Sequence, residues 1–281
     1  MAGRTPPFPN PPLVLTVLEI RYPKLAEGFG ESARRQMAEA VRDHLPLLES
    51  VVEEQVNVSV EGPVPVASSI EHQQRTVPRF STRDRATALL VKPDALVIET
   101  TAYAGWLESF RPLVAEVLHA IERISQPNGV LRIGLRYIDE IRVPSIESAP
   151  GDWRGYIDKH LLAAADPGFI PASLRPSEWL GVVQYQTAPD SMLTVRYGPQ
   201  SGYAVNPAGP TRRRDPRPAG LFFLLDSDSS WHGATEVPEF RADWICERCD
   251  LLHRPVSEFF RIVVTDRLCD EVFNRQEAGQ P

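Results

Sequence analysis

Apolar residues recur along the chain with two different periods, and these periods predict strands and helices. A period of two, or a short aliphatic run, is typical of a strand, whereas apolar residues three and four positions apart are typical of an amphipathic helix. In the first half the patterns predict strands over 13–20 and 52–60, a helix over 31–49, a hairpin over 86–101, a helix over 110–125 and a strand over 130–144.

The second half repeats a similar succession of patterns. Pro255 lies inside the last apolar stretch, where it cannot donate to residue 251 and crowds that carbonyl. We therefore expect two or three short helices in that stretch rather than one long helix. The complete prediction for this half is a helix near 153–165, strands over 179–186, 192–197 and 221–225, and helical structure over 239–273.

The order of these elements predicts the α+β class, with two ferredoxin-like α/β halves whose antiparallel sheets carry helices packed on one face. Proline is enriched, at 27 residues, and clusters at the N-terminus and between residues 199 and 218, which we interpret as connectors. The predicted organisation is a proline-rich leader (1–12), a first α+β half (13–146), a second α+β half (147–275) and a tail (276–281).

The strand over 130–144 separates two kinds of side chain sharply. Its sequence, VLRIGLRYIDEIRVP, places apolar residues on one face and Arg132, Arg136, Glu140 and Arg142 on the other. Unpaired arginines are incompatible with a dry core. We therefore expect this charged face to form part of a homodimer or partner interface; the alternative is salt bridging between neighbouring strands.

Asp139 lies on the apolar face of the same strand, between Tyr137 and Ile141. One interpretation is a structural acid that is bonded to backbone amides or to an arginine. The other is a buried functional acid whose pKa is raised in a pocket. The sequence leaves both interpretations open.

A second group of basic residues lies in the loop TRRRDPR, residues 211–217. Such a group can hold a phosphate backbone or an acidic partner. The alternative is a solvated mobile linker, because no aromatic residue is interleaved for base stacking. The candidate binding residues of this loop are Arg212, Arg213, Arg214 and Arg217.

Composition narrows the classes of partner. The 281 residues include 30 Lys and Arg against 37 Asp and Glu, a formal net charge of −7, which disfavours nucleic acid as a partner. No apolar run reaches the roughly 18 residues that span a bilayer, and the start, MAGRTPPFPNPP, lacks the apolar core of a signal peptide. Three cysteines are too few for a secreted disulfide framework. We expect a cytoplasmic protein with reduced thiols and no membrane contact.

The motif C-x-x-C-x-x-x-H, formed by Cys246, Cys249 and His253 and followed by Cys269, resembles a zinc site. However, its spacing places the motif on one apolar stripe of a predicted helix. We interpret the two thiols as buried packing residues and His253 as a helix-end histidine, and we predict no metal.

Two further polar stretches contain candidate site residues. His72 and Arg75 lie in a predicted loop and lack a third catalytic partner. Asp226 and Asp228 follow the strand 221–225, where metal or phosphate ligands are common, but Asp and Ser also form turns, which we favour. None of the motifs G-x-G-x-x-G, G-x-x-x-x-G-K-[ST] and G-x-S-x-G is present. The sequence predicts no cofactor and identifies no catalytic residue.

The segments LRIGLRYIDEIRVP and HRPVSEFFRIVVTDRLCDEVF, together with Trp106 and Phe110, resemble a sporadically distributed family of uncharacterised bacterial proteins, from Pro11 to Phe273. The middle strand of that family has the form R-Y-x-N-R-I, so Arg136, Tyr137 and Ile141 match. Asp139 and Glu140 depart from it, which places in doubt any role that needs an amide at 139. The resemblance implies no enzyme activity and, by analogy, an association with mobile or defence loci.

The hypothesis that follows is a non-enzymatic binding or interaction protein that self-associates or has a protein partner, as in a mobile defence or toxin-antitoxin type system. The missing catalytic signatures motivate it. The alternative is an RNA- or nucleotide-processing enzyme of ferredoxin-like architecture, motivated by Arg132, Arg136 and the arginine loop.

Overall fold

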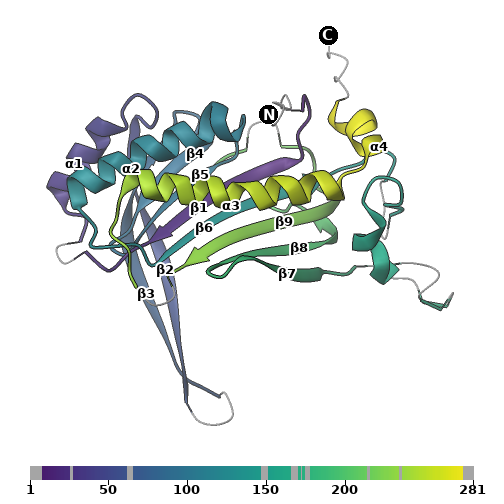
Figure 1. Cartoon of the computed structure of the whole chain (residues 1–281), viewed down its shortest axis with the longest axis horizontal. Coiled ribbons are helices and arrows are strands. Elements are labelled where there is room, and N and C mark those ends of the chain that lie inside the picture. The colour runs from purple at the N-terminus through teal and green to yellow at the C-terminus, as the bar shows by residue number, and fades with distance from the viewer. Residues whose placement is uncertain are drawn as a thin grey trace.

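Nine strands of the described chain form one continuous antiparallel sheet in the computed structural model (Figure 1). The structure describes residues 8–25, 28–61, 66–146, 151–165, 170–171, 173–174, 178–213, 216–233 and 236–274. The sheet order is β2-β3-β4-β5-β1-β6-β9-β8-β7. The strands are β1 (Leu13–Arg21), β2 (Leu47–Glu61), β3 (Val66–Ser81), β4 (Thr87–Val91), β5 (Ala95–Thr100), β6 (Arg132–Ile141), β7 (Gly181–Ala188), β8 (Ser191–Gly202) and β9 (Gly220–His232).

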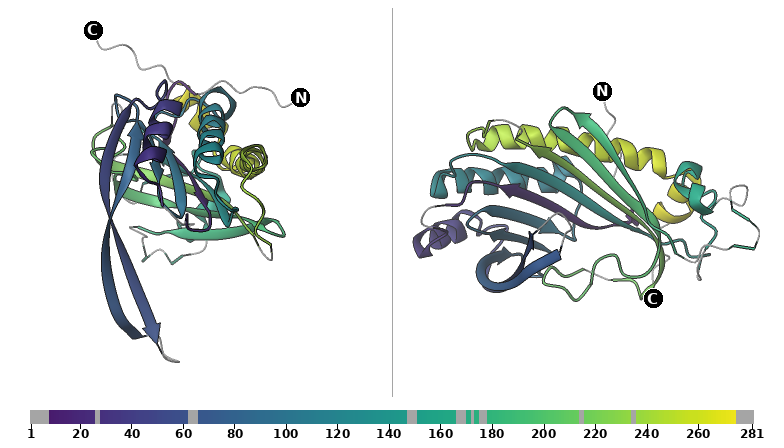
Figure 2. Two further views of the ribbon diagram at one scale, coloured as in Figure 1. Left: turned by 90° about the vertical axis from the view of Figure 1, so that its left-hand side faces the viewer. Right: turned by 90° about the horizontal axis from the view of Figure 1, so that it is seen from below.

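Three helices, α1, α2 and α3, lie on one face of this sheet (Figures 1 and 2). We call the side that they cover the helix face and the other side the open face. None of the helices in the described residues is long and apolar enough to cross a membrane. The helical segments are α1 (Glu31–Ala40), a π-helical turn (Trp106–Phe110), α2 (Arg111–Ser125), a 3-10 segment (Lys159–Ala165), α3 (Ala242–Val263), α4 (Asp266–Leu268) and a second π-helical turn (Cys269–Phe273).

Period-two alternation produces the two faces. In β1 every second side chain is buried, and Leu18 and Ile20 join the core beneath the helices. In β6 the predicted apolar side chains, such as Ile133 and Leu135, enter the same core. The α+β class, the antiparallel pairing and the placement of helices on one face are therefore confirmed.

The two predicted halves share the one sheet. β1 and β6 pair at its centre; β5, β4 and β3 follow outward from β1, and β9, β8 and β7 follow outward from β6. The sheet thus divides between β1 and β6, and each half of the sheet has an inner strand, a meander that ends beside it, and a helix, α2 or α3. Along the chain this division lies between α2 and β6, not at residue 146. The ferredoxin-like pattern is not confirmed, because four strands separate α1 from α2. The β6–β9 pairing also crosses the expected boundary at residue 146.

Prolines account for two differences from the predicted helices. The helix expected over 31–49 ends at Ala40 and is followed by turns over 41–44. Pro46 disfavours helical geometry in the residue before it, and β2 begins directly after it at Leu47. Conversely, α3 runs unbroken through Pro255, so the expectation of short helices there was wrong. Leu251 is 49% exposed, so water can reach the carbonyl that loses its partner.

Two further segments differ from the predicted elements. The stretch around His72 and Arg75, expected to be a loop, belongs to β3, which pairs with β2 along its whole length to form a long arm beyond the sheet (Figure 1). Residues 153–165 form only the 3-10 segment instead of a full helix.

The two ends of the described chain meet beside the sheet. The backbone N–H of Asn10 donates to the carbonyl of Phe273 at 2.9 Å, and its side-chain amide donates to the carbonyl of Val272 at 3.1 Å. The rings of Phe8 and Phe273 lie 5.1 Å apart. Residues 8–12, which precede β1, are therefore fixed to the helical turn Cys269–Phe273.

Candidate functional site

The open face brings the charged residues of β6 together with acids from neighbouring strands. Arg132 donates to Glu19 of β1 at 3.0 Å and lies 3.8 Å from Asp228 of β9. Arg142 donates to Glu140 at 2.8 Å. Salt bridging between strands, the alternative that the sequence left open, is therefore present on this face, whereas its use as an interface stays a prediction.

The centre of the open face holds a cluster of two arginines on one acid. Nε and Nη2 of Arg136 donate to the two carboxylate oxygens of Asp226, each at 2.7 Å, and Arg196 of β8 lies 3.5 Å from the same carboxylate. The Asp226 side chain is 4% exposed, whereas those of Arg136 and Arg196 are 45% and 39% exposed. Hydrogen bonding to Asp226 raises the pKa of the Arg136 guanidinium.

Asp226 lies inside β9, not in the expected turn after residue 225, and this prediction was wrong. The run DSDSS alternates Asp with Ser, and its acids meet Arg132 and Arg136 across the strand pair β6–β9. The alternation was the available signal, but turn propensity concealed it.

The connection from β8 to β9 crosses the open face. We call its residues 203–213 the strap. It begins after Gly202, whose φ of 98° favours glycine. The Ala204 N–H donates to Glu140 at 2.9 Å, and Arg213 lies 3.1 Å from the same carboxylate. The interpretation of this loop as a solvated linker is therefore wrong for Arg213, whose side chain is only 11% exposed. The side chain of Arg212 is exposed, and Arg214 lies outside the described residues.

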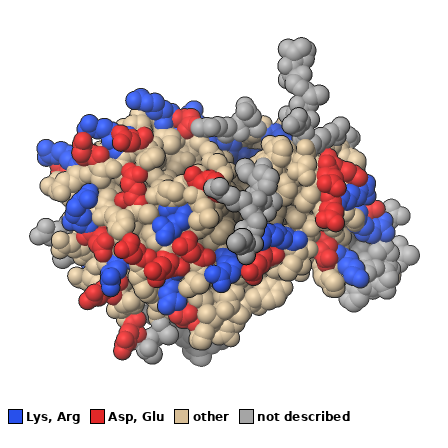
Figure 3. All heavy atoms as spheres, turned by 45° about the horizontal axis from the view of Figure 1, so that its top comes forward, with Lys and Arg blue, Asp and Glu red and all other residues tan. Residues whose placement is uncertain are grey.

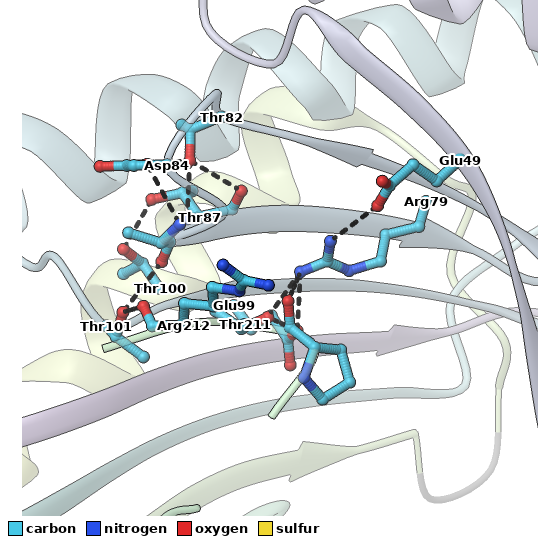
Figure 4. A network of polar contacts seen from close by, with 12 residues as sticks. Glu49, Arg79, Thr82, Asp84, Thr87, Glu99, Thr100, Thr101, Thr211 and Arg212 are labelled. Atoms are coloured by element: carbon cyan, nitrogen blue, oxygen red, sulfur yellow. Dashed lines mark hydrogen bonds and ion pairs between the residues drawn. The ribbon is translucent and has the colours of Figure 1, made fainter. Parts of the chain in front are cut away.

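Arg79 of β3 fixes the far end of the strap (Figure 4). Its guanidinium donates to the carbonyl of Pro210 at 2.8 Å and to the Thr211 hydroxyl at 2.9 Å, and Thr211 also contacts Glu99 of β5. The Arg79 side chain is 2% exposed, and burial lowers its pKa against the opposing effect of Glu99. Sequence reasoning missed Arg79, because its partners lie 131 and 132 residues further along the chain.

Asp139 is buried on the helix face. Burial, and then the negative charge of Asp226, raise the pKa of its carboxyl to about 8. No hydrogen bond or ion pair to its side chain occurs among the described residues, so the expected pairing with an arginine is absent from this part of the chain. The carboxyl is therefore mostly protonated at neutral pH. A functional role for it stays a prediction.

The predicted cysteine and histidine stripe lies on α3. Cys246 and Cys249 are buried, as expected for packing residues, and burial raises the pKa of Cys246 to about 11. His253 lies in mid-helix instead of at its end: its Nδ1 is 2.9 Å from the Tyr137 hydroxyl, and its ring stacks on Trp106 at 4.8 Å. Burial lowers the pKa of His253 to about 4. No group of three or more His, Cys, Asp or Glu side chains within the described chain could hold a metal ion.

Of the remaining polar candidates, His72 and Arg75, the structure describes the side chain of Arg75. Arg75 lies 3.4 Å from Asp94, and the side chain of His72 lies outside the described residues. On the face shown in Figure 3, basic and acidic side chains are interspersed. The charged residues that the structure does bring together are those of the open face.

Comparisons with protein-family models, with curated proteins and with solved structures give no match to this chain. The geometry of the open face therefore carries the functional argument.

Proposed function

We propose that the chain is a non-enzymatic binding protein that docks a protein partner on the part of the open face outside the strap. The observation that carries the proposal is the cluster of Arg136 and Arg196, whose half-exposed guanidiniums rest on the buried carboxylate of Asp226. We call these two arginines, with Val182 and Met192, the docking patch.

The buried acid gives the arginines a fixed geometry. The two 2.7 Å bonds from Arg136 to Asp226 hold its side chain, so little rotamer entropy remains to be lost on binding. Arginine is enriched among the residues that contribute most to protein interfaces, because its planar fork binds carboxylates and stacks on aromatic rings. A preorganised, accessible guanidinium is well suited to contact a partner.

Two exposed apolar side chains lie on the same face as the arginines. Val182 of β7 is the cross-strand partner of Arg196 and therefore shares its face, and it is 58% exposed. Met192 of β8 is 39% exposed on the same face. Arginine and methionine next to aliphatic residues are characteristic of the core of a protein interface.

Charge balance favours a protein over a nucleic acid. Four arginines of the uncovered face, Arg21, Arg132, Arg136 and Arg196, lie against three acids, Glu19, Asp226 and Asp228, so these residues carry an excess of only one positive charge. A surface that tracks a phosphate backbone carries excess positive charge. The rival function, an RNA- or nucleotide-processing enzyme, therefore receives less support from this face.

The experiment starts with affinity capture from the native host and mass spectrometry, followed by binding measurements with the purified candidate partner. Arg196→Glu is the test variant, because Arg136 still neutralises Asp226 in it. Arg123→Glu, an exposed reversal on α2, is the matched control. We expect Arg196→Glu to weaken partner binding at least tenfold and Arg123→Glu to leave it within twofold, since reversed charge at an interface costs several kcal/mol.

Equal affinities of wild type and Arg196→Glu for every purified partner would contradict the proposal. Retention of labelled RNA at low salt that disappears with added salt would favour the rival function instead. Sedimentation of the same variants tests a second copy as the partner: loss of a dimer only in Arg196→Glu would identify self-association.

The proposed biological setting is a partner subunit of a mobile defence or toxin-antitoxin type system. A recurring gene neighbour with a recognisable effector domain would support this setting, and solitary genes in housekeeping surroundings would contradict it.

A further inference from the structure

A recess of about 210 Å³ lies where the strap, the end of β6 and the two ends of the described chain meet. Its polar lining consists of Asn10, Thr101, Glu140, Arg142, Arg213 and Arg217. We call it the arginine cavity. It shares no residue with the docking patch.

Two guanidiniums in this cavity share one carboxylate. The side chains of Arg142 and Arg213 are each 11% exposed, and that of Glu140 is 1% exposed. One carboxylate neutralises only one of the two cations, and burying an uncompensated charge is costly. Within the described residues, where Glu140 is the one acid in contact with either guanidinium, the pair therefore carries an excess of one positive charge in a sheltered place.

The contacts hold both arginines in position and leave donors available. Arg142 donates to Glu140 and, at 2.7 Å, to the carbonyl of Gly202, and its guanidinium lies 5.3 Å from the centre of the Phe222 ring. Both terminal nitrogens of Arg213 are directed at Glu140. Nη1 of Arg142 and Nε of Arg213 have no hydrogen-bond partner among the described residues.

Arg217 adds a further cation to the lining. It donates to the side-chain oxygen of Asn10 at 2.5 Å, and this amide in turn donates to Val272. The cavity is thus lined by cations from β6 and from the β8–β9 connection and is closed by residues from both ends of the described chain. Its volume equals about seven water molecules, enough for a tetrahedral anion and several waters.

We propose that the arginine cavity binds a small oxyanion, either a phosphate group or a carboxylate. Guanidinium groups bind both by charge-assisted, bidentate hydrogen bonds. Glu140 does not occupy the remaining guanidinium donors. Its two oxygens already accept hydrogen bonds from other donors of Arg142 and Arg213 and from the Ala204 N–H. It acts as a positioning residue that holds the two guanidiniums.

The test is calorimetric titration of the full chain with inorganic phosphate and, separately, with malonate, at constant ionic strength set by sodium chloride. We expect saturable binding of at least one anion to the wild type, weakened at least tenfold in Arg213→Gln. Arg212→Gln is the matched control, because the neighbouring side chain is exposed and does not line the cavity. Its affinity should stay within twofold of the wild type.

Thermal unfolding provides the second readout, since a ligand that binds the folded state raises its melting temperature. The anion should raise the melting temperature of the wild type and of Arg212→Gln but not of Arg213→Gln. If Arg213→Gln does not fold, Arg217→Gln replaces it with the same expected loss. Binding of phosphate alone would identify a phosphate group as the ligand, and binding of malonate alone a carboxylate.

The proposal is wrong if neither anion binds the wild type up to about 10 mM, or if Arg212→Gln weakens binding as much as Arg213→Gln. It is also wrong if both cavity variants bind like the wild type. None of these results depends on a protein partner, so they are distinguishable from a failure of the docking patch.

Discussion

Asp139 and Glu140 are consecutive residues of β6. Each is 5% exposed when the whole residue is counted, but the two side chains lie in opposite environments. Asp139 points to the helix face, where burial raises its pKa to about 8 and no described residue pairs with it. Glu140 points to the open face, where Arg142, Arg213 and a backbone N–H bind its oxygens. Equal burial therefore leads to a protonated acid on one side of the sheet and to an ion-paired network on the other.

The largest loss of stability is expected when the paired acid, Glu140, is removed. In Glu140→Ala, two guanidiniums that are each 11% exposed lose their shared carboxylate. We expect the free energy of unfolding, measured by urea denaturation, to fall by about 3 kcal/mol, because removal of one member of a buried ion pair leaves an uncompensated charge.

The control for this loss is Asp228→Ala, on the same face. Asp228 is 26% exposed and lies 3.8 Å from Arg132, so its removal should cost less than about 1 kcal/mol. Similar losses in the two variants would show that burial of the partners does not set the cost.

A second test of the difference between the two acids removes the ionisable group of Asp139. The folded chain holds the proton of Asp139 more tightly than the unfolded chain, because its pKa is raised from 3.8 to about 8. This contribution to stability is fully present below about pH 4 and is lost as the pH rises to about 8. In Asp139→Asn this loss should vanish. The variant should then be more stable than the wild type by about 3 kcal/mol above pH 8, because a pKa difference of about four between the folded and unfolded chains corresponds to about 6 kcal/mol, offset by about 1 to 3 kcal/mol for burial of an unpaired amide.

The measurement is urea denaturation of both proteins at a series of pH values, with circular dichroism to verify that the variant is folded. Parallel stability profiles from about pH 4 to pH 9 would contradict a raised pKa of Asp139. A variant that is less stable at every pH would show that the carboxyl makes a hydrogen bond that the amide cannot replace.

A third test measures how much an exposed ion pair contributes to the free energy of unfolding. Arg35 and Glu31 form an i,i+4 pair on α1 at 3.5 Å, with side chains 77% and 70% exposed. We expect Arg35→Gln to change the free energy of unfolding by about 0.3 kcal/mol or less, because water screens such pairs. A larger loss would mean that burial explains less of the Glu140 effect than we infer.

Local pattern was sufficient to predict much of the sheet. The alternation of β6 predicted which of its side chains face the core, since period two is a property of the strand itself. The helix face followed from apolar spacing in α2 in the same way. The order of the strands did not follow, because nothing in a short window specifies which strand β6 pairs with.

The candidate site depended on long-range partners, and the sequence predicted only one side of it. Arg136, Glu140 and Arg142 were recognised from β6 alone, but Arg213 lies 73 residues from the acid that it binds. Asp226 was assigned to a turn, since Asp and Ser favour turns when no partner is known. Such partners become visible only when the strands are placed side by side.

The contact between Asn10 and Phe273, near the two ends of the described residues, has a consequence for chain topology. Because each half consists of an inner strand, a meander and a helix, a short linker across this contact would allow circular permutation between α2 and β6. The permuted chain would begin with the second half and finish with the first. The order of its strands in space would be unchanged.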